Sequence, residues 1–342
     1  MIKNFLYMKP LLKKGEEVIR VICENILERV GNTPLTNIIS GDLDIELYAK
    51  LEYYNPTGSV KDRAASYIIK KLLDSGEIDQ DTTLIESSSG NFGIALSAYC
   101  KQYGLKFLCV IDPHINPINE AIIRKLGHSV VKVAEPDASG GYLLNRIKKV
   151  NELLMDIPNS YWVNQYGNPY NSEAYYNTLG VEICNGFENI DYIFMGVSSG
   201  GTITGVSRKL KEKFSNIKVI AVDIVGSVIF GGPAQKRYIP GIGSSMVPDI
   251  LKQAKIDDVV MVDEVSTIKM CHELLEKHYI FAGGSSGSVF HAVKQYFQGK
   301  RFNTKPRVLT IFADRGDRYS STIYNEAWYS NFTQKVTAVK AI

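Results

Sequence analysis

Several features that would narrow the function are missing from this sequence. Its five cysteines are an odd number and form no C-x-x-C pair, so a disulfide framework is excluded and reduced thiols are expected. Reduced thiols are typical of a cytoplasmic protein. The five histidines are scattered, and none has the spacing of a zinc ligand set. We therefore expect a cytoplasmic location and no metal.

Long apolar runs and a strong charge surplus are also lacking. No apolar stretch approaches the roughly 20 residues of a membrane-spanning helix, and the amino-terminal segment has neither the apolar core nor the cleavage site of a signal peptide. The formal net charge is only +3, which gives no support for nucleic-acid binding. With 342 residues, 45% of them hydrophobic, the chain can bury a large core and form two lobes. Neither a membrane nor a nucleic acid is expected as a partner.

Short apolar runs alternate with helical patterns along most of the chain. An amphipathic helix is expected over 18–30. Strands are expected over 46–52, 83–85, 107–111, 130–133, 192–197, 219–222, 259–262 and 308–312. Buried strands separated by helices predict an α/β fold with mainly parallel sheets flanked by helices.

One lysine stands where a helix begins. Residues 55–63 read Asn-Pro-Thr-Gly-Ser-Val-Lys-Asp-Arg, turn through Pro56 and Gly58, and open a helix whose apolar residues recur at helical spacing. Lys61 therefore lies in the first helical turn, where the helix dipole disfavours a cation. With some burial, this environment favours the neutral amine that attacks an aldehyde to form a Schiff base. Taken alone, a solvated lysine beside Asp62 is the alternative.

Three more loops lie where helices begin. Residues 86–93, Glu-Ser-Ser-Ser-Gly-Asn-Phe-Gly, offer hydroxyls and backbone N–H groups for a carboxylate, and Asn91 adds an amide for a ring hydroxyl. A serine or asparagine helix cap is the alternative there. Residues 198–205, Ser-Ser-Gly-Gly-Thr-Ile-Thr-Gly, let the backbone approach a phosphate closely but match neither glycine motif of nucleotide-binding proteins. Residues 281–288 alone are typical of a capping turn.

Pyridoxal 5′-phosphate acting on a small amino acid needs four features: an amine nucleophile, a phosphate cradle, a partner for its ring hydroxyl and a loop that binds a carboxylate. In this order they resemble the fold-type II pyridoxal-phosphate enzymes, the cysteine synthase and cystathionine β-synthase group, from about Gly31 to about Asp317. The resemblance implies pyridoxal 5′-phosphate as cofactor and a homodimer. It also implies a smaller mobile lobe over 55–168 and a larger lobe from 1–54 and 169–342.

The same resemblance assigns roles to individual residues. Lys61 is the expected Schiff-base lysine, Asn91 the partner of the ring 3′-oxygen, and Ser285 the residue facing the pyridine nitrogen. The phosphate is expected at Ser198, Ser199, Gly200, Gly201 and Thr202. The substrate α-carboxylate is expected at Ser88, Ser89, Gly90 and Gln165. A serine at the ring nitrogen gives a weaker electron sink than an aspartate would, which suits β-elimination. The expected reaction is β-replacement, with Lys61 as the base that removes the Cα proton.

Further stretches resemble one branch of that family, whose members join O-phospho-L-serine to L-glutamate. They include Leu-Glu-Tyr at 51–53, Tyr-Trp-Val-Asn-Gln-Tyr at 161–166, Pro-Gly-Ile-Gly at 240–243 and Asp-Arg-Gly-Asp-Arg-Tyr at 314–319. In that branch the product is a precursor of 2,3-diaminopropionate for siderophores such as staphyloferrin B, or for peptide antibiotics. The alternatives are a cysteine synthase using sulfide, a cystathionine β-synthase, and a catalytically silent fold with a regulatory role.

A phosphorylated donor and a dicarboxylate acceptor call for cations, because buried anions must be paired. Arg146 and Arg237 are the candidates. Tyr166 is expected to line the substrate pocket, with a place in the core as the alternative. Phe92 stands where cysteine synthases usually carry a small threonine, so it either reshapes the site for a bulkier acceptor or packs in the core.

Overall fold

The computed structural model describes residues 23–39, 41–137 and 140–340. Residues 18–22 of the helix expected over 18–30 lie outside this part of the chain. Over 23–30 the expectation is wrong, because only a short 3-10 helix, η1 (Ile26–Arg29), forms, capped by the Asn25 side chain. Ile26, which should have lain on the apolar face, is 66% exposed. The apolar spacing over 23–30 therefore does not mark the buried face of a helix.

The larger of two sheets has six strands in the order β1-β2-β10-β7-β8-β9. The strands are β1 (Leu35–Ile38), β2 (Glu46–Leu51), β7 (Tyr192–Gly196), β8 (Lys218–Ile224), β9 (Asp258–Val262) and β10 (Arg307–Phe312). Only β1 pairs antiparallel, with β2, and the other neighbours are parallel. The five strands after β1 match the apolar runs of the sequence.

The smaller sheet has four parallel strands in the order β5-β4-β3-β6. They are β3 (Thr83–Ser87), β4 (Lys106–Ile111), β5 (Ser129–Lys132) and β6 (Ser160–Trp162). The sequence did not predict β1 or β6, since both are short and only partly buried and so lack a continuous apolar run. The α/β fold class with mainly parallel sheets is confirmed.

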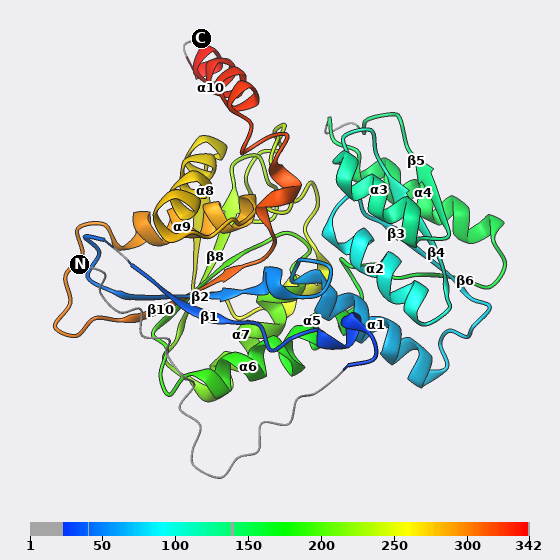
Figure 1. Cartoon of the computed structure of the whole chain (residues 1–342), viewed down its shortest axis with the longest axis horizontal. Helices are drawn as coiled ribbons and strands as arrows, with labels where there is room; N and C mark the ends of the chain where they lie inside the picture. Colours follow the sequence, from blue (N-terminus) through cyan, green and yellow to red (C-terminus); the bar gives the residue numbers. More distant parts are fainter. Residues whose placement is uncertain (1–22, 40, 138–139, 341–342) are drawn as a thin grey trace, which may run out of the picture.

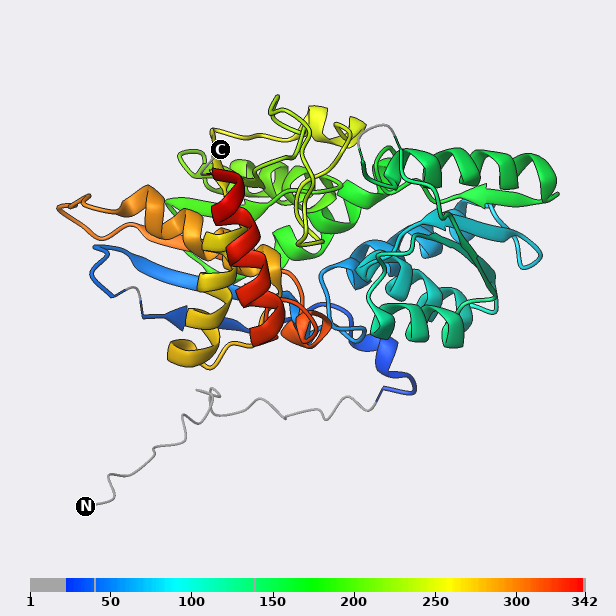
Figure 2. The same ribbon diagram turned by 90° about the horizontal axis from the view of Figure 1, so that it is seen from above.

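Helices cover both faces of each sheet (Figure 1). The helices are α1 (Lys61–Ser75), α2 (Asn91–Gln102), α3 (Pro117–Leu126), α4 (Leu143–Asp156), α5 (Pro169–Asn177), α6 (Leu179–Gly186), α7 (Gly201–Lys213), α8 (Glu264–His278), α9 (Gly284–Phe297) and α10 (Glu326–Lys340). Three short 3-10 helices complete the set: η2 (Glu52–Tyr54), η3 (Asp249–Gln253) and η4 (Gly316–Tyr319). Helix α10 runs along the side of the larger sheet (Figure 2). Trp328 and Phe332 of α10 pack in one cluster with Ile268 and Cys271 of α8.

Successive side chains along a strand pack into different hydrophobic cores on the two faces of the sheet. In the smaller sheet, Leu84 and Phe107 join the core that contains α2, whereas Ile85 and Leu108 pack against α4. This period of two is that of strands buried on both faces. Helix α1 contacts both α2 and α5 and so lies where the two sheets with their helices meet. The lobe boundaries near residues 55 and 168, and the mobility of the smaller lobe, stay predictions.

No described helix has both the length and the apolar content to span a membrane. The same part of the chain holds no group of three or more metal-ligating His, Cys, Asp or Glu side chains.

Candidate active site

Lys61 is the first residue of α1, as the sequence predicted. Its Nζ donates to the Ser199 hydroxyl at 2.9 Å and lies 5.8 Å from the centre of the Phe92 ring. Burial lowers the pKa of Lys61 to about 8, an effect that the charge of Glu86 partly opposes. At pH 7 about a tenth of such an amine is neutral, far more than for a surface lysine. The lysine is thus poised as a nucleophile or base.

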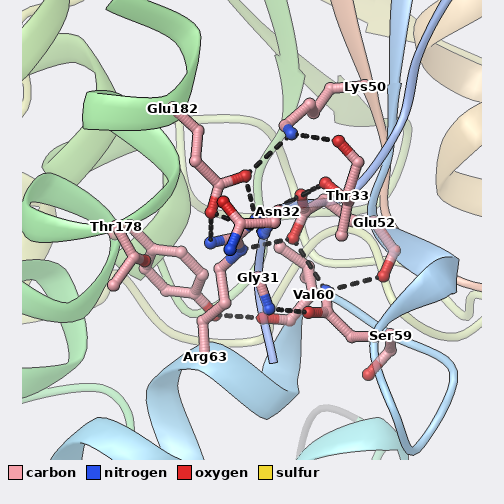
Figure 3. A network of polar contacts seen from close by, with 12 residues as sticks. Gly31, Asn32, Thr33, Lys50, Glu52, Ser59, Val60, Arg63, Thr178 and Glu182 are labelled. Carbon is pink, nitrogen blue, oxygen red and sulfur yellow. Dashed lines mark hydrogen bonds and ion pairs between the residues drawn. The ribbon is translucent and has the colours of Figure 1, made fainter. Parts of the chain in front are cut away.

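A buried ion network anchors the start of α1 (Figure 3). Arg63 binds the Glu52 carboxylate at 2.6 and 2.9 Å and the Glu182 carboxylate at 2.6 and 2.9 Å. Lys50 Nζ donates to Glu182 at 2.8 Å, and Asn55 Nδ2 donates to Glu52 at 2.9 Å. We call these five residues the α1 anchor. Because Asn55 and Arg63 flank the lysine turn on both sides, the anchor fixes where Lys61 stands.

The loop after β7 has the shape of an anion cradle. Gly200 adopts the left-handed conformation (φ +82°) at the N-cap of α7, and a Cβ on Gly201 would lie 2.3 Å from Asn171 Oδ1, so both positions require glycine. The first N–H groups of a helix have no acceptor within that helix, which together with the dipole favours a phosphate. The Ser198 hydroxyl donates to the Gly243 carbonyl at 3.1 Å and holds the loop in place.

Lys61, residues 198–203 and Ser285 line one cavity. Ser285 is the second residue of α9 and only 6% exposed. A reactive amine, an anion cradle and a buried hydroxyl around a single space are the donor set that pyridoxal 5′-phosphate requires. The residues present therefore fit this cofactor.

Asn91 begins α2 and is tied to the larger sheet through Asp314, just beyond β10. Its Nδ2 donates to Asp314 Oδ2 at 2.8 Å, and the Tyr319 hydroxyl donates to the same oxygen at 2.8 Å. Burial raises the pKa of Asp314. Asp314 was not predicted as a site residue, although its place at the carboxyl end of a parallel strand is where α/β proteins build sites.

The Glu86 carboxylate stabilises the loop 86–93 through hydrogen bonds. This carboxylate accepts the backbone N–H of Ser87 at 2.9 Å and that of Gln165 at 3.2 Å. Burial raises the pKa of Glu86 to about 7, against the opposing effect of those hydrogen bonds. The Ser88 hydroxyl accepts from Gly93 N–H at 2.9 Å. The N-cap of α2 is Gly90, without a side-chain cap, so the alternative of a serine or asparagine N-cap is wrong. Gln165 and the loop are thus held as one unit.

Ser89 belongs to a second polar group. Its hydroxyl donates to Asp112 Oδ2 at 2.6 Å and accepts from Arg146 Nη1 at 2.8 Å, and that Nη1 lies 3.1 Å from the same Asp112 oxygen. Arg146 is therefore beside the carboxylate loop, but its charge is already paired. Sequence reasoning missed Asp112, a polar residue that directly follows β4.

The two aromatic candidates differ in burial. Phe92 is 2% exposed and belongs to the main core, as one of the two expectations for it stated, and its ring also faces Lys61. A role of Phe92 in reshaping the site for a bulkier acceptor stays a prediction. Tyr166 is half-buried. Burial raises the pKa of Tyr166, while the charges of Arg146 and Arg237 act against that rise.

Comparison with known proteins defines the class. A sequence model of the pyridoxal-phosphate dependent enzymes matches residues 26–314, and the chain belongs to this family. It is 42% identical over 319 residues, 92% of this chain and 94% of the relative, to the N-(2-amino-2-carboxyethyl)-L-glutamate synthase of Cupriavidus metallidurans.

Solved structures agree with this assignment. The O-acetylserine dependent cystathionine β-synthase of Helicobacter pylori is 35% identical, with a TM-score of 0.82 over 89% of this chain and all of that one. A hydrogen sulfide-producing enzyme of Fusobacterium nucleatum is 29% identical, with a TM-score of 0.81 over 87% of this chain and all of that one. The fold-type II assignment, the enzymatic nature of the protein and pyridoxal phosphate as its cofactor are confirmed. The roles of individual residues stay predictions.

Proposed function

We propose that the protein joins O-phospho-L-serine to L-glutamate, giving N-(2-amino-2-carboxyethyl)-L-glutamate and phosphate as a precursor of 2,3-diaminopropionate. The observation that carries this proposal is the 42% identity, over nearly the full length of both chains, to a synthase of that name. The coarser statement, a pyridoxal-phosphate enzyme of β-replacement chemistry, follows from the family together with the named relatives.

In this proposal residues that line the cavity, together with Asn91 from outside its lining, hold the cofactor. Lys61 binds it covalently, residues 198–202 bind its phosphate, Ser285 faces its ring nitrogen and Asn91 its ring oxygen. When bound, pyridoxal phosphate supplies the electron sink that makes the substrate Cα proton acidic and allows the β-substituent to leave. Asp314 keeps the Asn91 amide oriented through the 2.8 Å hydrogen bond.

Lys61 then moves the proton. Once the incoming substrate amine has released Lys61 from the cofactor, its Nζ takes the proton from the substrate Cα and returns it after the new bond to Cβ has formed. A pKa lowered to about 8 by burial supports this role, because a base works best when its pKa lies near the operating pH. The hydrogen bond to Ser199 at 2.9 Å supports the orientation of the free amine beside the phosphate loop.

The substrate is oriented by the loop 88–90 and Gln165, which together grip the α-carboxylate. Arg146 binds the donor phosphate and Tyr166 lines the pocket beside it. Arg146 reaches Ser89 at 2.8 Å, which supports a place next to the substrate. Its pairing with Asp112 means that a phosphate must compete with, or share, that carboxylate, so Asp112 tunes the affinity for the donor. The active form is proposed to be a homodimer.

A sulfur nucleophile is the competing assignment, because the Helicobacter pylori relative of 35% identity is named an O-acetylserine dependent cystathionine β-synthase. The two are separated by incubating the pyridoxal-phosphate-loaded protein with O-phospho-L-serine and equimolar sulfide, homocysteine and L-glutamate, followed by mass spectrometry. The glutamate adduct is the expected product. Cysteine or cystathionine as the main product would overturn the assignment, and no product at all would favour the catalytically silent alternative.

A further inference from the structure

Arg237 lies against the backbone that supports the phosphate loop. A Cβ on Gly243 would stand 2.5 Å from Arg237 Nη1, so the guanidinium rests directly on Gly243. The N–H of Gly243 donates to the Val197 carbonyl at 2.7 Å, and its carbonyl accepts from the Ser198 hydroxyl. Gly243 thus contacts both the Arg237 guanidinium and Ser198, which lines the cofactor cavity.

The charge of Arg237 is not matched. Its Nη2 donates to the Ser245 hydroxyl at 3.0 Å, but Nη1 is buried without a hydrogen-bond partner among the described residues. In that part of the chain no carboxylate lies within ion-pair distance of it. Burial lowers the pKa of Arg237, and the charges of Asp223, Tyr166 and Glu264 only partly oppose this. A buried guanidinium with an unpartnered N–H gains strongly from an anion.

Arg146 provides a contrast. It comes from α4, beside the smaller sheet, and its guanidinium is paired with Asp112 at 3.1 Å. Arg237 comes from the segment between β8 and β9 of the larger sheet. The charges of both act on Tyr166, so the two guanidinium groups approach the same region from different sheets. Of these two cations, only Arg237 lacks an anionic partner.

We propose that Arg237 binds a carboxylate of the second, nucleophilic amino acid, which makes it the residue that selects a dicarboxylate acceptor. This inference rests on the proposed function. The donor loop 88–90 and Arg146 lie together through Ser89, so they serve the first substrate. A dicarboxylate acceptor then needs a further cation, and Arg237 offers a fork of N–H groups that matches a carboxylate.

Arg237→Gln is the test, with Lys236→Gln as its matched control. Lys236 is the preceding residue and is exposed, so its substitution removes the same charge without touching Gly243 or Ser245. Kinetics are measured on the pyridoxal-phosphate-loaded enzyme with L-glutamate and with L-glutamine, which lacks the second carboxylate. For Arg237→Gln the KM for glutamate should rise about 10- to 100-fold, the loss of one charge-assisted interaction. The KM for O-phospho-L-serine and the rate with glutamine should not change.

Arg237→Lys keeps the charge and should restore part of the affinity for glutamate, which separates recognition from a folding defect. An unchanged KM for glutamate in Arg237→Gln would overturn the inference while leaving the proposed function intact. An equal loss for both substrates would also overturn it and would assign Arg237 to the donor or cofactor phosphate. A wild-type enzyme that makes no glutamate adduct would overturn the proposed function and the inference together.

Discussion

Removing Arg63 from the α1 anchor should be among the most damaging single changes in this protein. The side chains of Arg63 and Glu52 are 1% and 0% exposed, and that of Glu182 is 18% exposed. Arg63→Met keeps most of the side-chain volume but leaves two carboxylates facing each other without their shared cation. Breaking one partner out of a buried ion pair typically costs about 3 to 5 kcal/mol, because a buried charge is left uncompensated.

The assay is urea unfolding of the wild type and the variant, read by tryptophan fluorescence and circular dichroism. The free energy of unfolding should fall by about 3 to 5 kcal/mol, and Arg63→Lys should recover only part of it because an ammonium cannot bind two carboxylates in the same planar geometry. Lys70→Met is the control on the same helix. It breaks an exposed pair, with Lys70 and Asp74 side chains 65% and 58% exposed, and should leave the unfolding curve unchanged.

A second readout separates anchoring from stability alone. If the anchor fixes Lys61, then Arg63→Lys should lose kcat even at temperatures where the protein is fully folded, while KM for the donor changes little. A variant that loses less than about 1 kcal/mol of stability would refute the energetic argument for the network. A folded variant with wild-type kcat would refute its role in placing Lys61.

Three other outcomes are expected. Burial alone would raise the pKa of Glu182, but Arg63 and Lys50 outweigh it and lower the value from 4.5 to about 2, so this carboxylate stabilises the fold fully above its unfolded pKa. The stability advantage of wild type over Glu182→Gln in urea unfolding should therefore shrink as the pH falls from 4.5 towards 2, and a constant gap would contradict it. Lys61→Ala should abolish turnover, and borohydride reduction followed by peptide mass spectrometry should find the pyridoxyl group on Lys61 in wild type alone; label on another lysine would refute that role. Arg146→Ala should weaken O-phospho-L-serine far more than O-acetylserine in steady-state kinetics, and equal losses would remove its phosphate role.

The parts of the fold that the sequence predicts are those with a strong local signal. Strands such as β7 and β10 are continuous apolar runs, and the start of α1 at Lys61 follows from the turn through Pro56 and Gly58. The glycines at 200 and 201 predicted a backbone that can approach an anion closely. Gly200 is left-handed and Gly201 has no room for a Cβ, while the anion itself stays a prediction. The cofactor was predicted from the order of the motifs, a pattern that no single loop contains.

The rest depends on contacts between distant residues, which local patterns do not contain. Glu182 meets Arg63 across 119 positions of sequence, and Asn91 meets Asp314 across 223. The pairing of Arg146 with Asp112 is likewise absent from any local pattern, because an arginine with a buried partner has the same sequence signal as one on a solvated face. The apolar spacing over 18–30 misled because Ile26 meets no buried surface in the described structure.

The central claim is that the cavity around Lys61 carries out a β-replacement between a phosphorylated serine and glutamate. It is tested most directly by mixing carbon-13-labelled O-phospho-L-serine with nitrogen-15-labelled L-glutamate and measuring the product mass for wild type and Lys61→Ala side by side. The account predicts one product that carries both labels, formed only by the wild type, with phosphate released in equal amount. A wild-type reaction without a doubly labelled product, or a Lys61→Ala variant that makes as much of it, would contradict the account.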